Sequence, residues 1–369
     1  MRASTRLEEK YLLMDDNALA AGVALRKAEL GKRLCILAHH YQRDEIVRFA
    51  DFVGDSLRLS QQAAELKAEF VVFCGVHFMA ESADILARHG QAIILPDLAA
   101  GCSMAEMATA EDMQDALDAI AAAAPGARVV PVSYVNSTAA VKAVTGRAGG
   151  ACCTSSNARK VFEWALAPAD AGGAAGQKIL ALPDQHLARN TALAMGYTLA
   201  DCVVYDPAKG NGGLSDEQLR AAKFILWKGH CYVHQHFSVE RIRQLRREIP
   251  GVQVIVHPEC PYEVVAEAGQ SGSTEQILRV VNASPAGSRW AVGTEINMVR
   301  RLARANPDKR ILPLSESPAL CTMMDRIDLR RLLWVLDELA GGRVVNRIQV
   351  RPEVAQDARI ALERMLTHT

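Results

Sequence analysis

The chain alternates short apolar runs with longer segments of helical period. Runs rich in Val, Ile and Leu, such as 34–38, 70–76 and 178–182, are followed by segments rich in Ala, Leu, Glu and Arg. Near-continuous apolar runs of this length are typical of strands buried on both faces, and amphipathic segments between them are typical of helices that connect parallel strands. The pattern therefore predicts the α/β class.

The runs group into three similar units. In each unit a strand ends in a polar tip, a Ser-containing segment opens a helix, a second strand ends in another tip, and a third strand leads to a cysteine. The first tips begin at His39, Tyr134 and His257, and the closing cysteines are Cys102, Cys231 and Cys321. The distance from tip to cysteine is 63 residues in the first unit and 64 in the third, whereas the middle unit needs 97.

This repeat predicts three three-layer α/β/α sub-domains around a pseudo-threefold axis, with the active site at the centre. The expected units are residues 1–110, 111–232 and 233–324, with the helical segment 325–369 packing back on the first. Parallel sheets present their ligands at the carboxyl ends of the strands, where the tips and the three cysteines lie.

Composition narrows the classes of function. Among 369 residues, Lys+Arg and Asp+Glu both number 42, so no basic excess points to a nucleic-acid partner. Segment 1–32 is charged and lacks the apolar core of a signal peptide, and no apolar stretch reaches the roughly 18 residues that cross a bilayer. We therefore expect a soluble cytoplasmic protein with small-molecule substrates.

The nine cysteines favour metal binding over a disulfide framework, since their number is odd and no secretory signal is present. Cys102, Cys231 and Cys321 come from three distant segments, without the close pairs of a structural zinc site. Three thiolates suit a 4Fe-4S cluster that keeps one iron open for catalysis. Cys35 and Cys74 lie inside predicted strands and are interpreted as core residues.

Three other cysteines compete less well for a ligand role. Cys260 is the strongest competitor because it follows His257 and Glu259, but neither other unit has a cysteine at the end of its first strand. Cys152 and Cys153 precede a helix start and are interpreted as a pocket wall.

Hydroxyl residues at the predicted helix starts favour anions, because free backbone N–H groups point outward there. They are Ser56, Ser155, Ser156, Ser273 and Thr274. Each can equally be an ordinary helix cap, but three such starts facing one axis predict a small anionic substrate.

Candidates for proton transfer and orientation lie on or after the strand tips. They are His39, Tyr41, Tyr134, Asn136, His234, His257 and Glu259. Glu259, beside His257 on a tip stiffened by Pro258, is the first choice for general base.

At these residues the sequence resembles the quinolinate synthase family, the A protein of de novo NAD biosynthesis. The matching motifs are AHHYQ (38–42), DFVGDSL (51–57), GCSMA (101–105), YVN (134–136), TSSNA (154–158), WKGHCYVH (227–234), HPEC (257–260) and GTEINM (293–298). They span about residue 35 to residue 325, in order and with family-like spacing.

The resemblance implies condensation of iminoaspartate with dihydroxyacetone phosphate to quinolinate, inorganic phosphate and water. It implies one 4Fe-4S cluster on Cys102, Cys231 and Cys321, whose open iron acts as a Lewis acid. By matching position, the site would be lined by His39, Tyr41, Ser56, Tyr134, Asn136, Ser155, His234, His257, Glu259, Ser273 and Thr274. L-aspartate oxidase, which makes iminoaspartate, would be a transient partner.

The sequence departs from the family at one point. Some members carry a C-x-x-C-x-x-C run that ends at the third ligand, whereas Ser315 and Pro318 precede Cys321 here, so a regulatory disulfide cannot form in that segment. Two alternatives stay open: another 4Fe-4S hydro-lyase acting on a small anion, and a non-catalytic iron-sulfur sensor or electron carrier. The latter would normally want four ligands.

Overall fold

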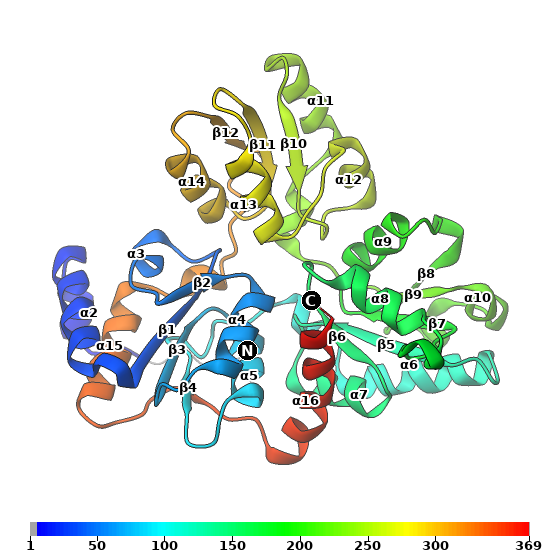
Figure 1. Cartoon of the computed structure of the whole chain (residues 1–369), viewed down its shortest axis with the longest axis horizontal. Helices are drawn as coiled ribbons and strands as arrows, with labels where there is room; N and C mark the ends of the chain where they lie inside the picture. The colour runs from blue at the N-terminus through cyan, green and yellow to red at the C-terminus, as the bar shows by residue number, and fades with distance from the viewer. Residues whose placement is uncertain (1–5, 369) are drawn as a thin grey trace. The chain divides into compact units, whose positions relative to one another are not determined.

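The computed structural model describes residues 6–368. Residues 1–5 and 369, at the ends of the predicted segments 1–110 and 325–369, lie outside the described residues. The predicted α/β class is confirmed, because mainly parallel strands form three separate sheets flanked by helices (Figure 1). By their internal contacts the described residues divide into two compact units. The pseudo-threefold axis and the three domain boundaries stay predictions.

The first unit contains residues up to 102 together with 296–301 and 320–351. Its five-stranded sheet has the order β13-β4-β3-β1-β2, and only β13 runs antiparallel to its neighbour. The strands are β1 (Leu34–His39), β2 (Phe52–Gly54), β3 (Phe70–Cys74), β4 (Ala92–Ile94) and β13 (Arg347–Ile348). All residues of β1 and β3 are buried, as the near-continuous apolar runs predict.

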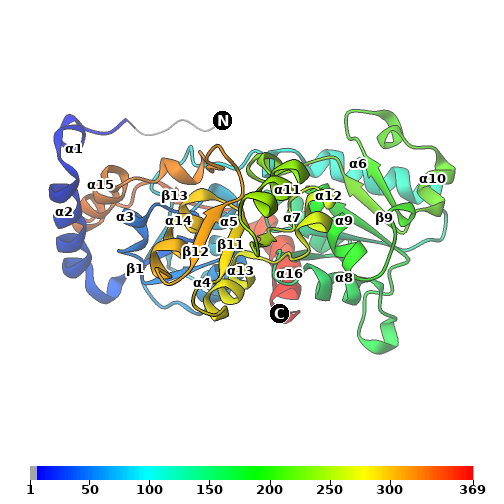
Figure 2. The same ribbon diagram turned by 90° about the horizontal axis from the view of Figure 1, so that it is seen from above.

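Helices cover both faces of this sheet. They are α1 (Glu9–Leu13), α2 (Asp16–Leu30), α3 (Asp44–Val47), α4 (Ser56–Glu65), α5 (His77–Leu86) and α15 (Leu329–Ala340). Helices α2 and α15 pack together on one side, and α4 packs with α5 on the other (Figure 2). Tyr11 and Arg26 fasten the N-terminal helices to α15, since both donate to the Asp337 carboxylate, at 2.8 and 2.7 Å.

The second unit contains residues 103–295, 302–319 and 352–368. Its larger sheet is fully parallel, with the order β6-β5-β7-β9-β8. The strands are β5 (Val129–Tyr134), β6 (Ala151–Cys153), β7 (Lys178–Leu182), β8 (Cys202–Tyr205) and β9 (Phe224–Trp227). The helices around them are α6 (Ala110–Ala123), α7 (Ala139–Arg147), α8 (Ala158–Leu166), α9 (Gln185–Ala194) and α10 (Asp216–Ala221). Trp227, Met113, Ile120 and Leu180 share one buried apolar cluster there.

The smaller sheet of the second unit is also parallel, with the order β10-β11-β12. Its strands are β10 (Gln253–Val256), β11 (Arg289–Gly293) and β12 (Arg310–Pro313), and its helices are α11 (Val239–Glu248), α12 (Tyr262–Ala268) and α13 (Thr274–Ala283). Helix α14 (Ile296–Ala305) is divided between the two units.

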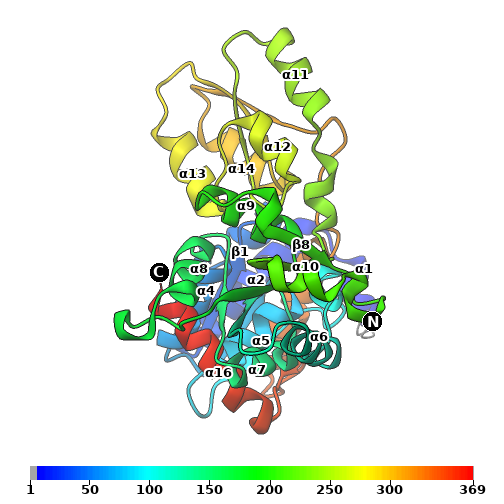
Figure 3. The same ribbon diagram turned by 90° about the vertical axis from the view of Figure 1, so that its right-hand side faces the viewer.

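The C-terminal helix corrects one prediction. Of segment 325–369, expected on the first sub-domain, residues 325–351 do belong to the first unit, where α15 packs on α2. Helix α16 (Pro352–Thr367) instead packs against α7 and β6 of the second unit (Figures 1 and 3). Its buried face carries two alanines, and Gly146 of α7 allows the close approach, because a Cβ there would lie 2.0 Å from the Asp357 carbonyl oxygen. The amphipathic pattern identified a buried face but could not identify its partner.

Among residues 6–368, no helix combines the length and apolar character needed to cross a membrane.

Candidate active site

The predicted general base lies on a buried turn at the carboxyl end of β10. The backbone N–H of His257 bonds to the Gly293 carbonyl of the neighbouring strand, and the N–H of Cys260 closes the turn onto the His257 carbonyl, at 2.9 and 3.0 Å. His257 and Glu259 are 2% and 3% exposed. A carboxylate so far from water must be paired within the protein.

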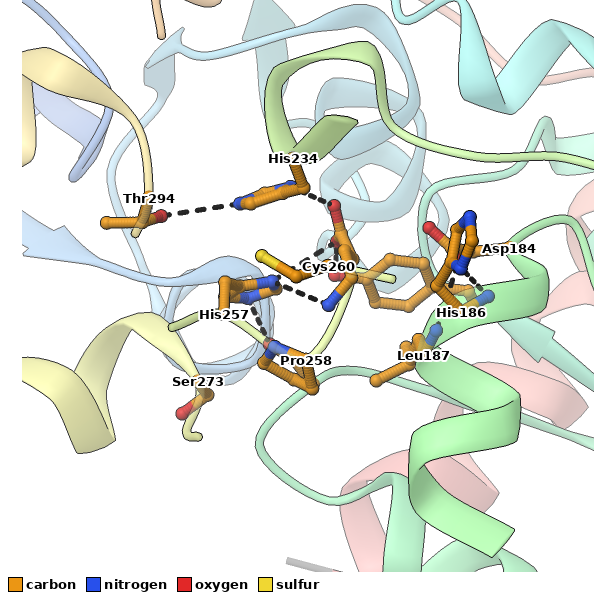
Figure 4. Close-up of polar contacts among 12 residues, drawn as sticks. Asp184, His186, Leu187, His234, His257, Pro258, Cys260, Ser273 and Thr294 are labelled. Atoms are coloured by element: carbon orange, nitrogen blue, oxygen red, sulfur yellow. Dashed lines mark hydrogen bonds and ion pairs between the residues drawn. The ribbon is translucent and has the colours of Figure 1, made fainter. Parts of the chain in front are cut away.

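Side chains from two other segments supply that pairing. The Tyr134 hydroxyl, at the end of β5, donates to Oε1 of Glu259 at 2.5 Å. Nδ1 of His234, in the 3-10 helix Tyr232–His236, lies 2.8 Å from Oε2 (Figure 4). The sequence predicted all three residues, and the structure brings them together.

These contacts fix the charge of Glu259. Burial opposes ionisation of the carboxyl, but the neighbouring His234 and the hydrogen bonds from His234 and Tyr134 outweigh it and hold its pKa below the usual range. Burial lowers the pKa of His257 to about 3, with the attraction of Glu259 opposing and His234 adding to the shift. Glu259 is therefore an anion at neutral pH, and His257 is neutral.

The two histidines form a stacked pair that reaches further polar groups. Their ring centroids are 4.6 Å apart and their planes differ by 21°. Nε2 of His257 lies 3.1 Å from the Ser155 hydroxyl, and Nε2 of His234 lies 3.4 Å from that of Thr294. Thr294, which the sequence analysis did not single out, follows β11 within a quoted motif.

The helix start predicted at α13 forms an ordinary cap, because the Ser273 hydroxyl accepts the N–H of Gln276 and Oε1 of Gln276 accepts that of Ser273. Ser273 is its N-cap and Thr274 its first residue, and both are buried. The Ser156 hydroxyl donates to that of Ser273 at 2.8 Å, so this helix start and the segment before α8 meet. Ser155 and Ser156 are only partly buried, but the Ser156 N–H is donated to the Thr154 hydroxyl, so anion binding at these helix starts stays a prediction.

The tip after β5 carries Asn136, which is partly buried, and its Oδ1 makes no hydrogen bond within the described residues. The Ser137 hydroxyl donates to the Tyr134 carbonyl at 2.8 Å, and the ammonium of the fully buried Lys142 donates to the Ser137 carbonyl. This polar support holds the backbone that presents Tyr134 and Asn136.

Asp184, which sequence reasoning missed, lies close enough to Glu259 for the charge of Glu259 to change the pKa of Asp184. Oδ1 of Asp184 caps α9 by accepting the N–H groups of His186 and Leu187 at 2.7 and 2.9 Å, while Oδ2 is buried and has no partner among the described residues (Figure 4). Burial and then the charge of Glu259 raise the pKa of Asp184 well above its usual value. The two carboxyls therefore differ in direction: the pKa of Glu259 is lowered, and that of Asp184 is raised. The available signal was the polar tip 183–186 after β7.

The cysteines fall into two groups by burial. Five are buried: Cys35, Cys74, Cys152, Cys153 and Cys260. The three predicted ligands, Cys102, Cys231 and Cys321, are partly exposed, as is Cys202 at the start of β8. Burial, then Glu259 and Asp184, raise the pKa of Cys260 well above its usual value, which disfavours the thiolate a metal requires.

Cys231 offers the second unit a metal-binding constellation. One ligand atom each from Cys231, His234 and Glu259 lie within 4.8 Å of one another. Cys102 and Cys321 belong to the first unit.

The remaining predicted residues, His39, Tyr41 and Ser56, also belong to the first unit. Nδ1 of His39 accepts the backbone N–H of Tyr41 at 3.1 Å, and the two rings meet edge to face with centroids 4.6 Å apart. Ser56 is the first residue of α4, but its neighbour Asp55 makes the cap by accepting the N–H of Arg58.

Comparison with known proteins identifies the family of the chain. The sequence matches the family described as "Quinolinate synthetase A protein" over residues 23–367. The chain belongs to this family. It is 55% identical to a quinolinate synthase of a Nocardioides species over 95% of this chain and 89% of the relative. A quinolinate synthase of Streptomyces coelicolor is 53% identical over 95% of this chain and 88% of its own.

A third relative gives the same result. A quinolinate synthase of Geobacillus thermodenitrificans is 50% identical over 98% of this chain and 96% of the relative. The resemblance to the quinolinate synthase family is thereby confirmed over nearly the whole chain, and it spans both units.

Proposed function

We propose that the chain condenses iminoaspartate with dihydroxyacetone phosphate to quinolinate, inorganic phosphate and water, in the cytoplasmic de novo synthesis of NAD. The similarity to quinolinate synthases over nearly the full length supports the activity. The observation that carries the proposal is the ionised Glu259 held between Tyr134 and His234.

The condensation needs protons removed from carbon and returned to leaving oxygen. Glu259 is the group that accepts a proton, since it is anionic and two fixed donors set its position. The neutral His257 imidazole is the group that donates a hydrogen bond to substrate oxygen. Tyr134 acts with Glu259, to which its hydroxyl donates its one proton. Tyr41 is proposed to act with them, as its motif position implies.

Substrate charges are proposed to bind at the helix starts. Ser155, Ser273 and Thr274 lie at or just before the N-termini of α8 and α13, where the helix dipole favours phosphate and carboxylate. Asn136, His234, His39 and Ser56 complete the proposed substrate-binding set. L-aspartate oxidase is the proposed source of iminoaspartate.

Cys102, Cys231 and Cys321 are proposed to hold one 4Fe-4S cluster. They follow β4, β9 and β12 and are partly exposed, whereas the other cysteines outside β8 are buried. Such a cluster has an iron without a protein ligand, which supplies Lewis-acid chemistry to substrate oxygen or nitrogen.

The test is anaerobic purification followed by iron and sulfide analysis and an assay of quinolinate formation from the two proposed substrates. We expect about four iron and four sulfide per chain. A colourless protein with about one zinc per chain would instead indicate a single-ion site on Cys231, His234 and Glu259. That outcome would sink the cluster proposal.

Single replacements assign the ligands. Cys102→Ala, Cys231→Ala and Cys321→Ala should each lose the cluster and the activity, while Cys260→Ala, which removes a buried thiol beside the site, should keep the cluster. Loss of iron from Cys260→Ala would show that the ligand assignment is wrong.

A further inference from the structure

Helix α9 carries a buried amide whose function the proposed chemistry does not use. Asn190 lies in the middle of α9 and is 8% exposed. Its Nδ2 donates two hydrogen bonds, to the carbonyl oxygens of Pro258 and Cys260, both at 2.8 Å. These carbonyls belong to the residues immediately before and after Glu259.

The two hydrogen bonds use both protons of one amide. They join α9, a helix beside the larger sheet of the second unit, to the turn after β10 of the smaller sheet. The backbone N–H of Glu259 is held separately, by Nδ1 of His257 at 3.3 Å. Carbonyls this deep in the protein would be costly to leave unpaired. The backbone around Glu259 is thus fixed on both sides of the Cα atom.

The helix that presents the amide is itself anchored. Asp184 caps its first turn, and α9 packs against α8 and α12. Asparagine is a poor residue for a helix interior, so its place here is better explained by the tertiary hydrogen bonds than by helix stability.

We infer that Asn190 is a positioning residue of the active site, which sets where the Glu259 carboxylate lies by clamping the two carbonyls beside it. The inference rests on the proposed role of Glu259 as the proton acceptor. Catalysis is sensitive to placement, since a shift of about 1 Å in a reacting group can cost about 100-fold in rate.

The first test replaces the amide by an apolar side chain of similar size. Asn190→Leu should lower kcat by about 10- to 100-fold with KM changed less than about threefold. Asn306→Leu is the matched control, because Asn306 is a buried amide of the same unit whose Nδ2 also makes two hydrogen bonds, at 2.8 and 2.9 Å, away from this turn. Its kcat should stay within about twofold of the parent.

A milder variant keeps the test decisive if Asn190→Leu does not fold. Asn190→Ser retains one donor and should give an intermediate kcat. Folded Leu or Ser variants with parental kcat would overturn the inference.

A double variant separates positioning from general structural support. If Asn190 acts only through Glu259, adding Asn190→Leu to Glu259→Gln should not lower the residual rate further. A full additional loss would show that Asn190 acts elsewhere.

A readout without activity distinguishes this inference from the proposed function. Hydrogen exchange of the backbone of residues 257–261, followed by mass spectrometry, should be faster in Asn190→Leu than in the parent and in Asn306→Leu. If the parent forms no quinolinate, the proposed function fails, yet faster exchange still supports the clamp. Unchanged exchange contradicts it.

Discussion

Two strand tips in this protein use the same backbone device for different chemistry. After β1, Nδ1 of His39 accepts the N–H of Tyr41, and after β10, Nδ1 of His257 accepts the N–H of Glu259. In both tips the carbonyls on either side of the presented residue are held by one side chain. Arg301 donates to those of His40 and Gln42, and Asn190 to those of Pro258 and Cys260.

The difference lies in the charge of the clamp. Arg301 has a side chain 24% exposed and is paired with Asp44, so water and a carboxylate balance its charge. Asn190 is buried beside the turn that carries Glu259, whose Oε2 lies 2.8 Å from Nδ1 of His234. The neutral amide of Asn190 binds the two backbone carbonyls without adding an unbalanced buried charge. The two tips thus share a backbone geometry, while burial selects the side chain that supports it.

The largest expected effect comes from neutralising the residue at the buried tip. Glu259→Gln should lower kcat by about 10²- to 10⁴-fold, because an amide cannot take up a proton from substrate. Quinolinate formation measures the rate, and iron and sulfide content shows whether the cluster remains. Near-parental turnover in a cluster-loaded variant would remove Glu259 from the role of base.

A smaller loss is expected at the clamp of the other tip. Arg301→Lys keeps the charge but loses the planar fork that reaches two carbonyls, and kcat should fall by about 10-fold. Arg343→Lys, at a side chain 72% exposed, is the control and should change nothing measurable. Equal rates for both variants would break the parallel between Arg301 and Asn190.

The free energy of unfolding should fall in acid because His257 is buried. Burial depresses the pKa of His257 to about 3, whereas in the unfolded chain it titrates near 6.5. The unfolded state therefore binds the extra proton first, and stability present above pH 6.5 is lost as pH falls toward 3. From this group alone we expect a loss of about 2 kcal/mol between pH 6.5 and 5, and the lowered pKa of Glu259 acts in the same direction below its usual range.

Urea unfolding at both pH values, on parent and variants, measures this loss. His257→Asn should show a flatter dependence, and His236→Asn, at an exposed histidine, should keep the parental slope. A parental slope for His257→Asn would show that another group carries the acid sensitivity.

The sequence alone determined the long buried strands and much of the chemistry at their ends, but not the short strands β2, β6, β8 and β13. Apolar runs such as 34–38 became buried strands because a parallel sheet covered on both faces requires them. Tyr134, His234, His257 and Glu259 were predictable since parallel strands place their tips at one edge, and the structure joins them. The family motifs identified the same residues.

Only the tertiary structure decided which groups act on one another across the chain. The pKa of Asp184 is raised because folding buries it near Glu259, and Asn190 reaches Pro258 and Cys260 across 68 and 70 positions of sequence. Helix α16 packs closely on α7 because Gly146 has no side chain at the contact. Spacing along the chain encodes local period and caps, whereas burial, pairing of charges and close approach depend on neighbours that only the folded chain supplies.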